Sequence, residues 1–300
     1  MAIKKIQTES FLMRFFKKIK LDSIAWSLRR LYCPVDKDAL VLEVGSGANP
    51  YFRANVLCDA YEETQERYFA PLVRDRPIVL AFAERLPFKD DSFDFIIASH
   101  VLEHSTEPEK FFAEIQRVGK AGYIEVPDAF MERLTAYEFH RLEITDDKGV
   151  LLIKKKKNYI QDQEIRNLFI CKAASIFPKW VARFPFQFHI RYYWSRDSGG
   201  IKYKIINPEY KFDWEFPQSK KTDHSSRSPI AAILKRWILS IIRWMFSQKN
   251  RNRSINLLSL FRCIQCHGEA FKFEGSRAFC IHCRASHYVY LPGQKEVFNY

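Results

Sequence analysis

The sequence predicts an α/β fold built on a mostly parallel sheet, followed by a small metal-binding module. The first observation is an apolar run at 41–44 that leads directly into a loop with two glycines. The second is the recurrence of short apolar runs after it, as expected of strands that alternate with connections. The third is a pair of C-x-x-C motifs near the end of the chain. With 300 residues and 47% hydrophobic content, the chain is long enough for one large domain or two smaller ones.

The loop after the first strand predicts a ligand site. Gly45 and Gly47 allow a sharp turn and a close approach of the backbone to a ligand. Open α/β sheets bind their ligands at this carboxyl end of a strand. A dinucleotide fingerprint has its third glycine where this chain has Pro50, which argues against NAD or FAD. Glu43 beside the loop suits a cationic ligand instead.

Four more strands and one helix are expected between residues 54 and 126. Asp59, at the tip of the second strand, follows Gly47 by only twelve residues. In a dinucleotide fold the acidic residue follows the glycine loop by about 20 residues. The helix between the first two strands should therefore be short or missing here. Pro108 opens a helix whose apolar residues recur on one face. The expected strands are 54–58, 77–82, 92–98 and 123–126, and the helix is 108–118.

Four motifs in this region resemble those of class I S-adenosylmethionine-dependent methyltransferases with a type 11-like domain. They are E-x-G-x-G (43–47), L-P-F-x-x-x-S-F-D (86–94), V-L-E-H (101–104) and R-V-x-K-x-G (117–122). Their order and spacing match the family over residues 38–128. The resemblance implies a Rossmann-like sheet that ends in an antiparallel hairpin, and S-adenosyl-L-methionine as the cofactor.

The resemblance also implies which residues hold the cofactor. An acidic residue at the tip of the second strand accepts hydrogen bonds from ribose hydroxyls, and Asp59 is the candidate, with Glu62 and Glu63 as alternatives. The family often has Asp near position 82, where this chain has Phe82; adenine would then meet backbone groups around it, unless Phe82 is only a core residue. The full predicted set is Glu43, Gly45, Ser46, Gly47, Asp59, Phe82, Ala83, Glu84 and Ser99.

Three histidines are candidates for lining the reacting centre. His100 and His104 follow the fourth strand, beside the reacting methyl group in the resembled enzymes, and an imidazole can act as a base at neutral pH. The alternative for His104 is that it only orients the loop. His140 opens the later hairpin and has a structural alternative too. The same strand exit lacks the (D/N/S)-P-P-(Y/F) signature, which disfavours nucleobase and glutamine N-methylation.

The flanking segments are predicted as follows. Residues 6–32 have helical spacing and either cover the cofactor pocket or simply pack on the domain. Segments 141–145 and 150–153 predict a hairpin around a turn at 146–149, and 186–194 with 201–206 predict a second hairpin over the substrate site. Residues 216–229 are a predicted linker. The predicted domains are a helical cap (1–37), a methyltransferase domain (38–215), a linker with an amphipathic helix (216–259) and a zinc ribbon (260–300).

The net charge of +13 is unevenly distributed. Residues 1–150 carry 21 basic and 25 acidic residues, 151–262 carry 23 and 7, and 263–300 carry 4 and 3. The basic middle segment is either an ordinary solvated surface or a surface for an anionic partner such as membrane headgroups, a lipid-linked phosphate or RNA. The apolar helix at 230–246, with basic flanks and two tryptophans, predicts either interfacial membrane contact or burial between domains.

The cysteines predict a metal site rather than disulfides. Cys263, Cys266, Cys280 and Cys283 have the spacing C-x2-C-x13-C-x2-C, which suits a tetrahedral, structural Zn²⁺ site. Hairpin-like segments at 271–273 and 288–291 fit a zinc ribbon. This segment resembles the small zinc-ribbon proteins that activate methyltransferases, although Ile264 and Arg284 replace that family's usual Pro and Gly.

The expected function is transfer of a methyl group from S-adenosylmethionine to a small-molecule, saccharide or lipid-linked acceptor. The alternatives are methylation of RNA or a translation protein, and a scaffold that binds without chemistry. The cysteine usage and the lack of a signal peptide or of an apolar run of about 18 residues predict a cytoplasmic protein, with peripheral contact to the inner face of a membrane as an option.

Overall fold

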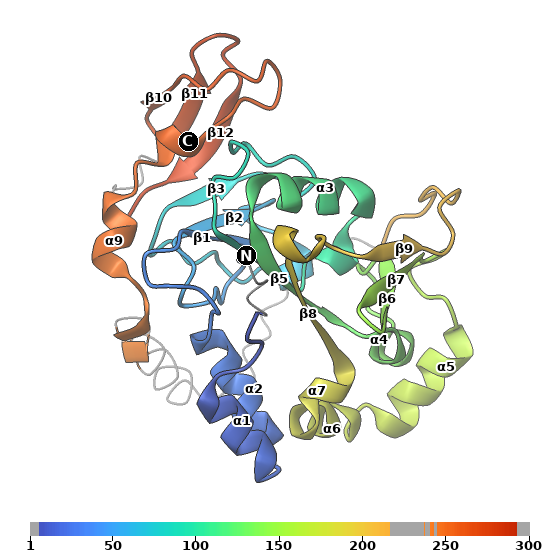
Figure 1. Ribbon diagram of the computed structural model, residues 1–300. Helices are drawn as coiled ribbons and strands as arrows, with labels where there is room; N and C mark the ends of the chain where they lie inside the picture. The colour runs from blue at the N-terminus through green and yellow to red at the C-terminus, as the bar shows by residue number, and fades with distance from the viewer. Residues whose placement is uncertain (1–5, 217–236, 238–240, 243–244, 293–300) are drawn as a thin grey trace.

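The computed structural model describes residues 6–216, 237, 241–242 and 245–292. The central feature is a nine-stranded sheet in the order β10-β11-β12-β3-β2-β1-β4-β5-β8, shown in Figure 1. Its parallel part is β3-β2-β1-β4-β5. The strand bounds are β1 Val41–Val44, β2 Val56–Asp59, β3 Ile78–Leu80, β4 Phe95–Ser99 and β5 Ala121–Pro127. The expected parallel sheet is confirmed, with every predicted strand in place.

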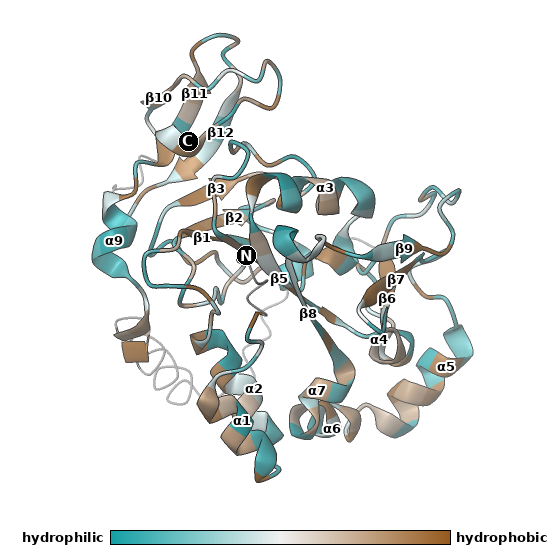
Figure 2. Cartoon of the chain, in the orientation of Figure 1, coloured by the Kyte–Doolittle hydropathy of each residue, from teal (hydrophilic) through white to brown (hydrophobic). Residues whose placement is uncertain are grey.

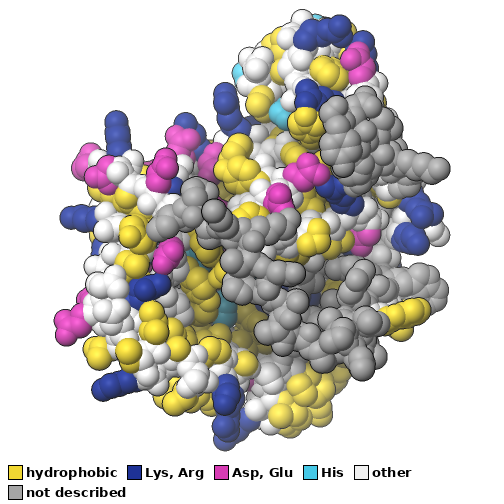
Figure 3. All heavy atoms as spheres, turned by 180° about the vertical axis from the view of Figure 1, so that it is seen from behind, with side chains coloured by type: hydrophobic (Ala, Val, Ile, Leu, Met, Phe, Trp, Pro, Cys, Tyr) yellow, Lys and Arg dark blue, Asp and Glu magenta, His cyan; other side chains and the backbone are white. Residues whose placement is uncertain are grey.

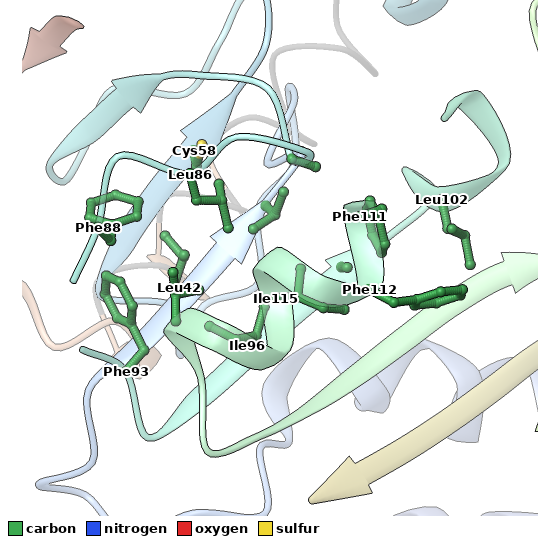
Figure 4. Close-up of a cluster of buried hydrophobic side chains, with 14 of the residues drawn as sticks. Leu42, Cys58, Leu86, Phe88, Phe93, Ile96, Leu102, Phe111, Phe112 and Ile115 are labelled. Atoms are coloured by element: carbon green, nitrogen blue, oxygen red, sulfur yellow. The ribbon is translucent and has the colours of Figure 1, made fainter. Parts of the chain in front are cut away.

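The parallel strands are buried on both faces because alternate residues enter two hydrophobic clusters. Leu42 and Val44 belong to one cluster, while Val41 belongs to the other. Figure 2 shows hydrophobic residues along these strands and hydrophilic ones on the outer face of α3. The larger cluster is covered by α3 (Pro108–Val118), whose bounds equal the predicted ones. Figure 4 shows α3, the strands and the loop at 86–93 contributing side chains to this cluster.

The connections on the other face contain little regular structure. No regular helix separates β1 from β2 in the described chain, and only the 3-10 turn η2 (Gln65–Arg67) lies between β2 and β3. The loop residues Tyr51 and Leu72 cover this face in place of helices. The expected loss of the first connecting helix is therefore confirmed, and a second connection is reduced as well.

The N-terminal segment is helical, as predicted, and forms two short helices. They are α1 (Phe11–Lys18) and α2 (Asp22–Leu28), followed by the 3-10 turn η1 (Arg29–Leu31). The chain reverses at Lys20, which has a positive φ of 59°. Arg29 then reaches the centre of the sheet, as described below.

The hairpin expected at 141–153 forms, but it lies outside the central sheet. Strands β6 (Leu142–Asp147) and β7 (Val150–Lys155) pair antiparallel and are joined by β9 (Tyr203–Ile205), which runs parallel to β7. The antiparallel strand that extends the central sheet is β8 (His189–Ser195), paired with β5. The predicted second hairpin is therefore wrong, because its two arms join different sheets. Burial of Ile190, Tyr192 and Trp194 explains why β8 packs on β5 instead.

Several short elements complete the described chain. The turn η3 (Leu102–His104) lies between β4 and α3. Between β5 and β9 the short elements are α4 (Ala129–Thr135), α5 (Gln163–Leu168), η4 (Phe169–Ala173), α6 (Phe177–Arg183), α7 (Pro185–Phe188) and η5 (Arg196–Ser198). Helix α9 (Lys249–Ser254) and η6 (Leu257–Leu260) lead into the cysteine module. None of the helices in the described part of the chain has the length and apolar content of a membrane span. Most of the predicted linker and of the helix at 230–246 lies outside the described residues.

The cysteine module continues the central sheet. Its strands are β10 (Phe271–Glu274), β11 (Arg277–Cys280) and β12 (Ser286–Tyr290), all antiparallel. β12 pairs antiparallel with β3, with Val289 opposite Val79. Phe261 stacks on Phe88 with ring centroids 5.7 Å apart, so the module and the sheet share one hydrophobic core.

Candidate active site

A cavity of about 610 Å³ opens at the carboxyl ends of β1, β2 and β4. This volume lies within the range of about 300–1,000 Å³ typical of ligand and cofactor pockets. The structure brings together there all of the residues that the sequence predicted for cofactor binding: Glu43, Gly45, Ser46, Gly47, Asp59, Phe82, Ala83, Glu84 and Ser99. His100 and His104 line the same cavity, whereas His140 lies behind His104.

The glycine loop has the backbone geometry that the sequence predicts. Gly45 and Gly47 have φ values of +67° and +55°, which side chains disfavour. A Cβ on Gly45 would lie 2.0 Å from Cγ2 of Val101, so the position has no room for one. Ser46 lies between the two glycines. Its amide donates to the Cys58 carbonyl at 3.1 Å and so connects the loop to β2.

Of the three acidic residues predicted for the ribose, Asp59 lines the cavity. The amide of Gly47 donates to its Oδ2 at 2.9 Å, and Arg67 Nη1 lies 3.1 Å from its Oδ1. Arg67 also lines the cavity and donates to backbone carbonyls, including that of Ala70. A ligand diol at Asp59 would therefore share the carboxylate with Arg67. Glu62 and Glu63, the alternatives, are not among the lining residues.

Glu43 lies at the floor of the cavity, only 2% exposed. The amide of Tyr51 donates to its Oε2 at 2.7 Å. Burial raises the pKa of this carboxyl to about 8, against the opposing effect of Arg30 and of the Tyr51 hydrogen bond. A cation bound at the loop would favour its ionised form.

Phe82 is a surface residue of the cavity rather than part of the core. It is 50% exposed, and its ring meets Tyr61 edge-on with centroids 5.4 Å apart. The interpretation of Phe82 as only a core residue is therefore wrong. Next to it, Glu84 accepts a hydrogen bond from the hydroxyl of Ser105, which fixes this side of the cavity.

His100 lies between two carboxylates. Its Nδ1 is 3.2 Å from Glu103 Oε1, and its Nε2 is 3.4 Å from Glu125 Oε1. Burial alone would lower the pKa of His100, but the hydrogen bonds and charges of these carboxylates outweigh it and raise the pKa to about 9. A histidine that is protonated at neutral pH is poorly suited to act as a general base.

His104 and His140 lie side by side, with their ring centroids 4.8 Å apart. The Nδ1 of His140 lies 2.6 Å from Glu132 Oε2, and Lys156 Nζ donates to Glu132 Oε1 at 2.9 Å. Burial, reinforced by the charge on His104, holds the pKa of His140 well below its usual value. Burial also lowers the pKa of His104, but Glu66 and Glu103 reverse this effect and raise it.

The sequence analysis missed Glu125 of β5, a buried carboxylate that contacts the lining residues Ser99 and His100. Arg29 donates to both of its oxygens, at 2.7 and 2.9 Å, and Ser99 Oγ donates at 3.0 Å. The hydroxyls of Tyr51 and Tyr123 donate to the same carboxylate. Burial would raise the pKa of Glu125, but His100 and Arg29 hold it well below its usual range. The sequence indicates Glu125 only as a single charged residue inside an apolar strand, and no nearby basic residue marks its partner.

The four cysteines form a compact cluster. Their Sγ atoms all lie within 4.8 Å of one another, with 3.4 Å between Cys263 and Cys283 and 3.5 Å between Cys266 and Cys280. These separations suit four thiolates around one ion and are far longer than an S–S bond. The cluster is compatible with a zinc ribbon, as the spacing predicts.

The comparisons with known proteins agree with this architecture. A family model described as a methyltransferase domain matches residues 42–124. An uncharacterised protein of Methanocaldococcus jannaschii is 25% identical over 132 residues, which cover 42% of this chain and 64% of that protein. The chain thus spans less than two thirds of the length of that relative.

The structural similarities are more distant. A methyltransferase from Thermotoga maritima has 21% identity, covers 39% of this chain and 55% of its own, and has a TM-score of 0.27. The YcgJ protein of Bacillus subtilis has 21% identity, coverages of 42% and 70%, and a TM-score of 0.29. A chain from the complex between the Haloferax volcanii Trm112 methyltransferase activator and a methyltransferase has 16% identity. The match covers 59% of this chain and 93% of that chain, with a TM-score of 0.32.

The match to the family model covers the glycine loop and the parallel strands from β1 to β5. Residues 42–124 are therefore a methyltransferase domain.

Proposed function

We propose that this protein binds S-adenosylmethionine in the 610 Å³ cavity and transfers its methyl group to an acceptor in the same cavity. The observation that carries the proposal is the convergence of all the predicted cofactor residues on one cavity at the carboxyl ends of the strands. In this assignment Asp59 holds the ribose, Phe82 contacts the adenine, and Glu43 lies near the cationic methionine part.

The chemistry needs alignment more than reactive side chains. The acceptor atom attacks the methyl carbon in line with the C–S bond, whose electron pair goes to sulfur and yields S-adenosylhomocysteine. A hydroxyl acceptor also loses its proton to solvent or to a base. Without a bound metal ion, His104 is the candidate for that base because it lines the cavity, whereas His140 lies behind it. The contacts of His100 with Glu103 and Glu125 suit a positioning role.

A calorimetric titration of the full chain with S-adenosylmethionine tests the cofactor assignment. Gly45→Arg should abolish binding, because the loop has no room for a side chain. Gly149→Arg is the matched control: Gly149 also has a positive φ, of +84°, but open space around it, and binding should persist. Folded wild-type protein that binds no cofactor would overturn the proposal and favour a partner-binding scaffold.

For the acceptor, we propose a small-molecule, saccharide or lipid-linked compound. Its support is an exposed apolar surface on the N-terminal helices and α6, where Phe11 is 72% and Trp180 58% exposed. Figure 3 shows hydrophobic side chains on the lower part of the molecule with basic ones at their edge. This arrangement suits a peripheral contact with a membrane.

Methyl transfer from labelled cofactor, measured with lipid-linked saccharides in anionic vesicles and with RNA, separates the acceptor classes. Transfer to the saccharides supports this proposal. Transfer to RNA that declines steeply with salt would instead support the alternative that the basic segment at 151–262 raises. Methylation of a translation protein is a third outcome that contradicts it.

We further propose that Cys263, Cys266, Cys280 and Cys283 hold a structural Zn²⁺ ion. The thiolate donor set and its close spacing support this assignment. All four positions of a tetrahedral ion are then filled by the protein, so the ion would stabilise the ribbon. A reduced cysteine cluster of this kind fits the cytoplasm.

A further inference from the structure

A second group of metal-ligating side chains lies beside the cavity. Glu103 and His104 of η3 and His140, just before β6, each offer one ligand atom, and these atoms lie within 4.8 Å of one another. The backbone holds the two segments together, because the amide of Arg141 donates to the Glu103 carbonyl at 2.6 Å. We propose that Glu103, His104 and His140 bind a divalent transition-metal ion.

Two buried atoms of this group have no hydrogen-bond partner. Glu103 is 1% exposed and its Oε2 is unpartnered, although its Oε1 meets His100. His104 Nδ1 is also unpartnered: Glu66 Oε2 lies 3.2 Å away, but without hydrogen-bond geometry. Leaving such groups unsatisfied is costly. A cation bound by this group would give the buried Glu103 carboxylate the partner that it lacks.

The outer contacts match those of a metal-bound histidine. His140 uses its Nδ1 for Glu132 at 2.6 Å, which leaves Nε2 as its free ring nitrogen. Glu132 is itself fixed by the buried Lys156. Metal-bound histidines commonly use their second nitrogen in this way, and the carboxylate fixes the ring orientation.

The donor set also determines what the ion can do. One carboxylate and two imidazoles suit Zn²⁺, Fe²⁺, Co²⁺ or Mn²⁺, and three protein ligands leave coordination positions open. His104 lines the cavity, so an ion bound to it would lie beside the cavity. If the proposed function holds, the ion would bind a hydroxyl oxygen of the acceptor and lower its pKa. The hydroxyl proton leaves to solvent, and the oxygen forms the new bond to the methyl carbon as the C–S bond breaks.

Titration with Co²⁺ of the full-length chain, loaded with one equivalent of zinc, tests the site. Absorption bands of a cobalt ion with nitrogen and oxygen ligands should appear without displacement of zinc, and metal analysis should find one cobalt beside one zinc per chain, as expected of the two clusters. Glu103→Gln should lose the cobalt and keep the zinc. Glu132→Gln should weaken cobalt binding about 10- to 100-fold. Glu107→Gln, an exposed carboxylate on the same cavity, should bind as the wild type does.

Two results would overturn the metal site. One is a wild-type spectrum with only sulfur-to-cobalt bands, and the other is wild-type affinity in Glu103→Gln. Cofactor calorimetry on the same samples separates this proposal from the proposed function. Cofactor binding without cobalt binding removes the metal site alone, and cobalt binding without cofactor binding removes only the role of the ion in methyl transfer.

Discussion

At the scale of single residues, the Arg29–Glu125 ion pair joins the N-terminal segment to the central sheet. Both oxygens of Glu125 accept from Arg29, and both side chains are buried. Arg29→Ala would leave the carboxylate buried without its main partner, so we expect a loss of about 3–5 kcal/mol in the free energy of unfolding. Urea denaturation measures it. Arg14→Ala, an exposed arginine of α1, should change stability by less than about 0.5 kcal/mol; equal losses would contradict the prediction.

Glu43 should make cofactor binding depend on pH. Its pKa of about 8 means that the empty carboxyl is mostly protonated at pH 7. A cationic ligand favours the carboxylate, so binding should release a proton, and the affinity should rise with pH up to about pH 8. Calorimetry in two buffers of different ionisation enthalpy measures the proton released.

Glu43→Gln provides the control for this titration. The variant cannot release a proton from position 43, and it retains the titration of the cofactor's own amino group. The difference in proton release between the two proteins isolates Glu43. An affinity of the wild type that falls with pH relative to the variant would contradict the prediction.

At the scale of elements, local patterns predicted strands and helices well, and pairing poorly. The apolar face of 108–118 predicted α3 because an amphipathic helix is determined by its own sequence. The arms 186–194 and 201–206 carried equally good hairpin signals, including the turn at Gly199 and Gly200. Their separation into two sheets depends on contacts of β8 with β5, more than sixty residues away.

The join between the cysteine module and the sheet gives a prediction at this scale. Phe261 is fully buried between Phe88 of the methyltransferase domain and Phe271 of the module. Phe261→Ala should cost about 3–5 kcal/mol through lost burial and the cavity left behind. Phe130→Ala, whose ring is 59% exposed, is the matched control and should cost far less. Similar denaturation midpoints for the two variants would show that the join contributes little.

At the scale of the whole molecule, the candidate site was predictable where its residues follow strand ends. Glycine loops and strand ends can be recognised from the local sequence. Every cofactor residue predicted in this way lines the cavity. Arg67, Glu125 and Arg29 could not be found in this way. Each acts across the fold, through a contact that exists only once distant segments pack together. The continuation of the sheet through β12 was equally invisible, since edge pairing leaves no local signal.

That continuation predicts how the molecule unfolds. Because β12 pairs with β3 and the two parts share one core, loss of the cysteine-bound ion should destabilise the methyltransferase domain as well. We expect one cooperative thermal transition in the zinc-loaded chain, moved to lower temperature by a chelator or by Cys280→Ser. Each kcal/mol lost lowers the Tm by about 2–4 °C in domains of 150–250 residues. Calorimetry on Glu103→Gln separates the two candidate metal sites. This variant keeps the four cysteines, so a chelator should still lower its Tm. Two separate transitions, with the larger one unmoved by chelation, would mean that the module and the sheet unfold independently despite their shared strand pairing.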